Sequence, residues 1–187
     1  QLTLSTKTTN DSAGEDIFGN KRATVKGKEQ IIKSDYGLIT FIDPRSGESA
    51  TFWGITTATE LSPMVVSGLD TFGNTFTTTT QTTFEAGSVH FGRQVAAETI
   101  STTSSVDMFG TLTTSTTTTD YRKEDGTLAY TLQSDGEGRF AYLTDSAKIT
   151  SEFSKEDVFG GTTTVTTPQI VINEYGITIS PEGFDIW

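Results

Sequence analysis

A four-residue motif, Asp-x-Phe-Gly, occurs four times in the chain and constrains its fold more than any other feature. Asp at the start of a type I turn accepts backbone N–H bonds, and Gly at the fourth position takes the positive φ of a hairpin bulge. Each copy therefore predicts a tight corner between antiparallel strands. The turn-forming pairs are Asp16 and Gly19, Asp70 and Gly73, Asp107 and Gly110, and Asp157 and Gly160.

Polar, β-branched runs follow the motifs and favour strands. Three runs, 75–83, 111–119 and 162–167, are rich in Thr. The chain has 38 Thr and 18 Gly but only 4 Pro, a mixture that suits strands and tight turns better than helices. The first copy is followed by 21–32, where apolar and charged residues alternate. This alternation predicts a single strand with one packed face and one wet face.

A second turn signal, combining acidic residues with Gly, follows each motif at a similar interval, at 35–37, 85–87, 124–126 and 174–176. The apolar runs behind these signals predict return strands at 38–42, 89–91, 128–132, 140–143 and 177–179. The nearest candidate for a helix is 94–98. We therefore predict an all-β, antiparallel fold of repeated β-hairpins, forming a sandwich-like or elongated hairpin-array domain. It is one domain, 1–187, with an N-terminal strand in 1–15 and units beginning near 16, 70, 107 and 157.

The segments 16–20 and 70–74, both Asp-x-Phe-Gly-Asn, and 135–140, Asp-Gly-Glu-Gly-Arg-Phe, resemble the Asp-x-x-Gly-Asn/Arg core of tyrosine-aspartate repeats. These Rhs-type repeats occur in large secreted bacterial surface proteins. The resemblance implies chains of β-hairpins in an extracellular bacterial protein. The chain departs from the family pattern because its spacing is longer and the Tyr before the Asp is replaced by Glu15, Leu69, Val106, Ser134 and Glu156.

Charge and composition limit the kinds of partner that the chain can have. The net charge of −11, from 24 acidic and 13 basic side chains, repels nucleic acid and anionic lipid. No apolar stretch has the length of a membrane-spanning helix, so we predict neither nucleic-acid binding nor membrane insertion. The chain begins with Gln1 rather than Met, which fits a matured chain or a piece of a longer one. The acidic, Thr-rich and Gly-rich composition favours an extracellular or cell-surface location.

Catalytic patterns are weak. The chain has no Cys, and its one His, His90, reads as a strand histidine beside a turn. Adjacent acids at 15–16, 124–125 and 156–157 belong to the turn signals, so solvated turn carboxylates explain them better than glycoside hydrolysis. Oxygen ligands for a structural calcium ion occur in 43–48 and 135–137, without the helix-loop-helix pattern. We predict no enzyme activity and no cofactor, with structural calcium as the alternative.

Two readings of function follow. In the first, the protein is a structural subunit that forms a homo-oligomer or homopolymer, such as a filament, sheath or surface layer. In the second, it is an adhesin or carbohydrate-binding module that uses Trp53, Tyr121 and Tyr142 as platforms for glycans. Asn10, in the sequence Asn10-Asp11-Ser12, is a glycosylation candidate.

Assembly would use edge-strand pairing or strand donation. The Thr runs 75–83 and 111–119 contain no Lys or Pro to protect an edge. The alternating N-terminal segment could be donated as a strand, although pairing within its own chain is as good a reading. The four motif rings either fill the ends of their own sheet, which we favour, or dock into another subunit. The candidate assembly residues are Leu2, Leu4, Phe18, Phe72, Phe109, Phe159, Ile186 and Trp187.

Overall fold

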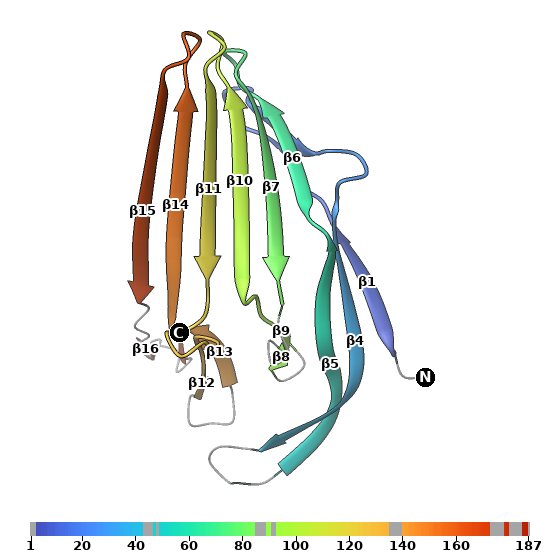
Figure 1. Cartoon of the computed structure of the whole chain (residues 1–187). Coiled ribbons are helices and arrows are strands. Elements are labelled where there is room, and N and C mark those ends of the chain that lie inside the picture. Colours follow the sequence, from blue (N-terminus) through green and yellow to red (C-terminus); the bar gives the residue numbers. More distant parts are fainter. Residues whose placement is uncertain are drawn as a thin grey trace.

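The structure, a computed structural model, describes residues 3–42, 47, 49–84, 89–90, 93–134, 140–172, 178–179 and 185–186. These residues form antiparallel strands and contain no helix (Figure 1). The predicted all-β, antiparallel fold is therefore confirmed. The strands are β1 (Ser5–Asn10), β2 (Ala13–Glu15), β3 (Lys21–Thr24), β4 (Gln30–Ile42), β5 (Ser49–Ser62), β6 (Met64–Leu69), β7 (Thr75–Thr83), β8 (Val89–His90), β9 (Arg93–Gln94), β10 (Glu98–Val106), β11 (Leu112–Asp120), β12 (Tyr130–Ser134), β13 (Phe140–Thr144), β14 (Ser146–Glu156), β15 (Thr162–Ile172), β16 (Thr178–Ile179) and β17 (Asp185–Ile186).

An eight-stranded sheet, in the order β15-β14-β11-β10-β7-β6-β3-β2, dominates the molecule. A three-stranded sheet, β1-β4-β5, continues from one side of it, and the pairs β8-β9, β12-β13 and β16-β17 form small hairpins (Figure 1). Within the large sheet, the hairpins β2-β3, β6-β7, β10-β11 and β14-β15 each turn at one of the four motifs. All four corners therefore lie at the same end of the sheet.

The four hairpins are level with one another. The residues that flank the turns are paired in a single lateral row across all eight strands, without stagger. Each motif begins at the residue after its upgoing strand, so the four turns stand side by side at one height. The row consists of Glu15, Lys21, Leu69, Thr75, Val106, Leu112, Glu156 and Thr162.

Hydroxyl groups line both faces of the large sheet, because neighbouring residues of a strand point to opposite faces. The Oγ1 atoms of Thr102 and Thr116 lie 3.2 Å apart on one face, and those of Thr78 and Thr103 lie 2.8 Å apart on the other. In the described parts of β7, β10, β11, β14 and β15, Ala147 is the one buried side chain. These strands are therefore held by backbone ladders and hydroxyl pairs more than by a hydrophobic core.

Three strands of the large sheet are each continued, nearly end to end, by a strand of the three-stranded sheet: β2 by β1, β3 by β4, and β6 by β5. Each such pair is called a line below. The line through β3 and β4 breaks at a turn in which Lys28 donates its N–H to the carbonyl of Val25 at 2.8 Å, with Gly27 at a φ of 78°. The line through β5 and β6 breaks at Pro63, which has no N–H. Val65 bridges the two breaks by pairing with Val25 and Lys28 at 2.8 and 3.0 Å.

The carboxylate of Glu60 closes the split where β5 leaves β7. Its Oε2 accepts the backbone N–H of Thr82 at 2.8 Å, and its Oε1 accepts a bond from the Gln30 side chain at 2.6 Å. Thr82 thus keeps a hydrogen-bond partner after its neighbouring strand has turned away. A small core lies nearby on the three-stranded sheet, where Ile32, Ser34 and Ala58 are buried, and Ser34 Oγ donates to Gln94 Oε1 at 3.0 Å.

Three local predictions are wrong. The segment 21–32 is two strands separated by the turn at 25–28 rather than one. The predicted turn at 35–37 lies inside β4, and the register shift between Asp35 and Tyr36 places the extra residue of a bulge, Thr56, on the neighbouring strand β5. The helix candidate 94–98 joins β9 to β10 without helical structure. The turn signals at 85–87 and 174–176 fall outside the described residues.

Gly68 and Phe76 form a cross-strand pair in which the aromatic ring covers the glycine. Gly68 is paired with Phe76 on β7 and with Arg22 on β3. A Cβ atom built on Gly68 would overlap the Phe76 ring and the carbonyl oxygen of Lys21. The absence of a side chain therefore lets the Phe76 ring lie directly over Gly68.

We predict that Gly68→Ala lowers the free energy of unfolding by roughly 1–3 kcal/mol, because the new methyl group must displace both the ring and the backbone. Urea unfolding followed by circular dichroism measures the change. Gly14→Ala is the matched control, because Gly14 is also a strand glycine and its Cβ would meet only the flexible Arg22 side chain, at 3.3 Å. Equal unfolding midpoints for the two variants would contradict the prediction.

Candidate functional site

The row of hairpin turns is the most regular feature of the described structure. In the turn at 70–74, Gly73 donates its N–H to the Asp70 carbonyl at 3.1 Å, and Asp70 donates its own N–H to the Asn74 carbonyl at 3.0 Å. The Asp70 carboxylate also accepts the N–H groups of Phe72 and Asn74 at 2.8 and 2.9 Å. Equivalent bonds occur in the other three copies, and all four Gly residues have φ between 83° and 88°.

These hydrogen bonds hold the pKa of all four carboxyl groups below the usual 3.8. The main cause at Asp16 is the Asn20 side chain, at Asp107 the Thr111 N–H, and at Asp157 the Gly161 N–H. At Asp70, desolvation raises the pKa, but the bonds from Asn74 and Phe72 outweigh it. The row thus carries four carboxylates whose charge is stabilised by backbone donors.

Asn side chains join neighbouring turns. Asn20 Oδ1 accepts the N–H of Thr71 at 3.1 Å, and Asn74 Oδ1 accepts the N–H of Met108 at 2.9 Å. The same two amides donate to the Asp of their own turn, at 2.7 and 2.6 Å. At the third junction the Asn is replaced by Thr111. A methyl group of Val158 lies beside Gly110 there, as a methyl group of Thr71 lies beside Gly19 at the first junction. The sequence signal for this link was the Asn after the first two motifs.

The four motif rings project into solvent from this row. The exposed fractions of Phe18, Phe72, Phe109 and Phe159 are 71, 74, 74 and 94%. The favoured prediction, that the rings fill the ends of their own sheet, is therefore wrong. The cause is the level register of the hairpins, which leaves no strand end or loop of the described residues above the turns to cover them. Ile17, Met108 and Val158, which precede three of the rings, are also exposed.

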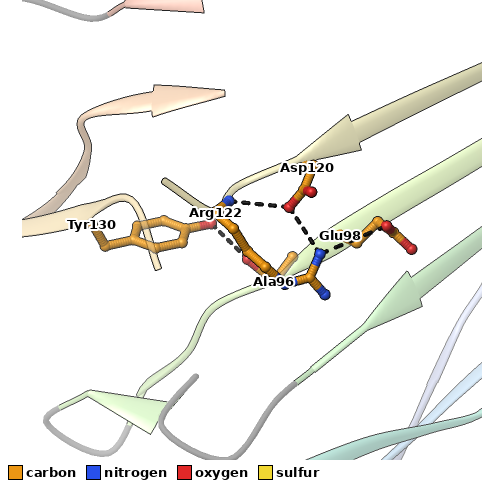
Figure 2. Close-up of polar contacts among 5 residues, drawn as sticks. All are labelled: Ala96, Glu98, Asp120, Arg122 and Tyr130. Carbon is orange, nitrogen blue, oxygen red and sulfur yellow. Dashed lines mark hydrogen bonds and ion pairs between the residues drawn. The ribbon is translucent and has the colours of Figure 1, made fainter. Parts of the chain in front are cut away.

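A cluster of polar contacts lies at the opposite end of the sheet (Figure 2). Arg122 Nη1 contacts Asp120 Oδ1 at 2.9 Å and Glu98 Oε2 at 3.7 Å, so one guanidinium links the ends of β10 and β11. Tyr130 donates its hydroxyl to the carbonyl of Ala96 at 3.0 Å. Partial burial, and the nearby Tyr121 ring as a lesser cause, raise the pKa of Tyr130 to about 12, so it remains a neutral donor. This arrangement ties connections together and presents no activated nucleophile.

A run of backbone hydrogen bonds crosses the sheet at the same level. Ala97 donates to Thr83, Tyr121 to Ala97, Ala129 to Tyr121 and Asp145 to Ala129, at distances of 2.7 to 2.9 Å. Ala97 and Ala129 have no exposed surface, so larger side chains would not fit. This end of the sheet is therefore closed by its connections, whereas the turn end is open.

The structure does not gather the predicted glycan platforms. Trp53 lies on β5 of the three-stranded sheet and donates its indole N–H to the Thr3 carbonyl at 2.9 Å. Tyr121 follows β11 and lies 5.9 Å, centroid to centroid, from the Tyr130 ring. The side chain of Tyr142, on β13, is outside the described atoms. Asn10, the glycosylation candidate, is exposed at the end of β1 and donates to Gln30 Oε1 at 2.9 Å.

Of the candidate assembly residues near the two ends of the chain, the structure describes the side chain of Leu4 alone. Leu4 is 70% exposed, and its carbonyl accepts the N–H of Tyr36 at 2.9 Å, just before β1 pairs with β4. The N-terminal segment offered for donation thus pairs within its own chain. Leu2, Trp187 and the Ile186 side chain fall outside the described part.

The described residues do not bring the predicted metal-binding and catalytic candidates together into a site. The calcium ligands proposed in 43–48 and 135–137 lie outside the described atoms, apart from the exposed Gly47. In the ranges that the structure does describe, no three acidic or His side chains are grouped to hold a metal, and no helix could cross a membrane. The side chain of His90 is not described. Asp16, Asp125 and Asp157, from the three acid pairs, accept hydrogen bonds inside their own turns.

No family model, curated protein or solved structure matches the chain. The turn row must therefore be interpreted from its own geometry. Its distinguishing property is a level line of exposed aromatic side chains, carried by turns whose own hydrogen bonds are exposed or part-buried.

We predict that Asn74→Ala lowers the free energy of unfolding by about 1–2 kcal/mol, because it removes the bonds to Asp70 and Met108. Asn10→Ala is the control, since it removes one exposed amide pair at the end of β1. Chemical denaturation of both variants tests this. A loss no greater for Asn74→Ala than for Asn10→Ala would show that the link between turns contributes nothing.

The turn carboxylates also predict a pH dependence. Because their folded-state pKa values are depressed, their contribution to stability is full above the unfolded value near 3.8 and is lost as the pH falls through the lower folded values. Asp157→Asn keeps an oxygen for the N–H groups of Phe159 and Gly161 but removes the charge. The drop in urea midpoint between pH 6 and pH 3 should therefore be smaller in this variant than in the wild type. An unchanged drop would contradict the assignment.

Proposed function

We propose that the protein is a non-enzymatic, extracellular structural subunit that assembles by edge-strand pairing into a filament, with β15 of one copy beside β2 of the next. The observation that carries the proposal is the relation between the two edges of the large sheet. β2 runs toward the row of turns and β15 runs away from it. A second copy placed beside the first by translation would therefore continue the same antiparallel meander.

The open edge of β15 supports this pairing. Asp157 donates its N–H to the Gly161 carbonyl at 2.9 Å, so these residues form a hydrogen-bonded pair. Because such pairs alternate along antiparallel strands, Thr162, Thr164 and Thr166 direct their backbone groups away from β14. Pro168 occupies the next outward position and has no N–H to offer. The six residues nearest the turns are thus open for pairing, and the proline limits pairing beyond them.

The β2 edge has a matching register. Asp16 donates its N–H to the Asn20 carbonyl at 3.1 Å, so Ala13 and Glu15 direct their backbone groups away from β3. Pairing Thr162 with Glu15 and Thr164 with Ala13 of the next copy keeps the turns level. The contact is short, but β3 and β6 pair over only four residues inside the chain.

Two of the routes to assembly that the sequence suggested, pairing at the Thr runs and donation of the N-terminal strand, are not available in the described structure. The Thr run 75–83 forms β7, and the run 111–119 lies in β11 except for its first residue; both strands have neighbours on both sides and offer no free edge. The N-terminal strand already pairs with β4. Edge pairing at β15 is therefore the route that the described geometry supports better. An extracellular location accords with the acidic, Thr-rich sequence, and the net charge of −11 keeps unassembled copies apart.

We predict that Thr164→Pro abolishes filament growth, because it removes an outward N–H at a position equivalent to that of Pro168. Thr164→Val is the control, since it keeps the N–H and the β-branched shape. Light scattering across a concentration series, with electron microscopy of the end point, measures assembly. Filaments from Thr164→Pro that match those of the control would refute pairing at this edge.

A further inference from the structure

We infer that the row of exposed rings is a comb by which two copies of the chain dock tip to tip, through a surface separate from the β15 edge. The comb consists of Phe18, Phe72, Phe109 and Phe159, with Ile17, Met108 and Val158 beside three of them. It occupies the end of the sheet where the four turns meet (Figure 1). The inference rests on the proposed function in one respect, namely that the partner is a second copy.

The apolar area of the comb is that of an interface. With about 200 Å² for a fully exposed ring, the four rings present roughly 600 Å². The three aliphatic neighbours bring the total to about 900 Å², whereas the largest apolar patch on a typical monomer covers about 300–600 Å². A standard protein interface uses about 800 Å² from each partner. One comb therefore suffices for a dimer.

The spacing of the comb selects its partner. Neighbouring turns are two strands apart, so the rings repeat at about 9.5 Å along the row. A ring inserted midway between two others would have its centroid about 4.8 Å from each, within the 4.5–7 Å at which aromatic rings pack favourably. A second comb with the same repeat can fill all the gaps at once. Another copy of this chain carries that repeat by construction.

Rigidity supports the same partner. The turns that carry the rings are fixed by the Asp carboxylates and linked by Asn20 and Asn74, so the ring spacing is set before docking. Little backbone freedom would be lost on association.

Charge argues against a lipid surface as the occupant. The turn segments 16–20, 70–74, 107–111 and 157–161 contain four Asp and no Lys or Arg. Peripheral membrane surfaces rely on basic residues for anionic lipid. Between two combs, the carboxylates are already held by backbone N–H groups, and added salt screens their mutual repulsion. Tip-to-tip docking should therefore strengthen with ionic strength.

The experiment uses the full chain carrying Thr164→Pro, so that edge pairing does not obscure the comb. Sedimentation velocity should show a dimer that is favoured by added salt. Replacing Phe18, Phe72, Phe109 and Phe159 together with Ser should weaken the dimer by roughly 100-fold or more, leaving a monomer. The urea midpoint should stay unchanged, because the rings are exposed and support no core.

A matched control replaces Leu4, Leu38 and Leu61 with Ser, since these leucines are also exposed, at 70, 70 and 54%, but lie on the three-stranded sheet or just before it. This variant should remain dimeric. A Thr164→Pro chain that is monomeric in all salts would overturn the comb, as would equal dimerisation of the Ser variant. Ring-dependent binding to phosphatidylcholine vesicles without dimerisation would assign the comb to lipid instead. Filaments formed by the Thr164→Pro chain would contradict edge pairing at β15. In that case the loss or retention of docking in the Ser variant would alone decide whether the comb mediates it.

Discussion

The carboxylate of the motif Asp is the interaction on which the rest of the structure depends. In each copy it accepts the N–H of the Phe and the N–H two residues beyond, so the turn is held by contacts within five consecutive residues. Because the same turn begins at the same level in four hairpins, the ladders between hairpins can form without stagger. The level row, the free edges and the exposed rings are all consequences of that repetition.

A sheet with hydroxyls on both faces needs support that a hydrophobic core would otherwise supply. Interior strands obtain it from backbone ladders on both sides and from hydroxyl pairs such as those between Thr78 and Thr103. The end away from the turns is closed by Ala97 and Ala129, whose backbone groups join successive connections. Stability is thus spread along the sheet, and each hairpin depends mostly on its immediate neighbours, as in repeat proteins.

How far the sequence predicts this structure depends on how local each feature is. The Asp-x-Phe-Gly corners and the Thr strands are set by adjacent residues, and the sequence shows them directly. The break at 25–28, the register shift between Asp35 and Tyr36 and the interior position of the Thr runs depend on pairing with strands distant in the chain. The exposure of the rings could be predicted only from the register of all four hairpins relative to one another. The link through Asn74 was visible only as a repeated Asn, because its acceptor role involves the following turn.

The edge and the comb act along perpendicular directions, so under the proposed assembly each would strengthen the other. Growth through β15 and β2 would place the turn at 157–161 beside the turn at 16–20 of the next copy, at the same repeat as within one chain. The comb of a filament would then be a continuous row. Docking one row on another turns many weak contacts into a single event, since every later contact forms at a high effective concentration. Assembly would therefore be cooperative, with filaments docking far more firmly than the dimer of two isolated copies.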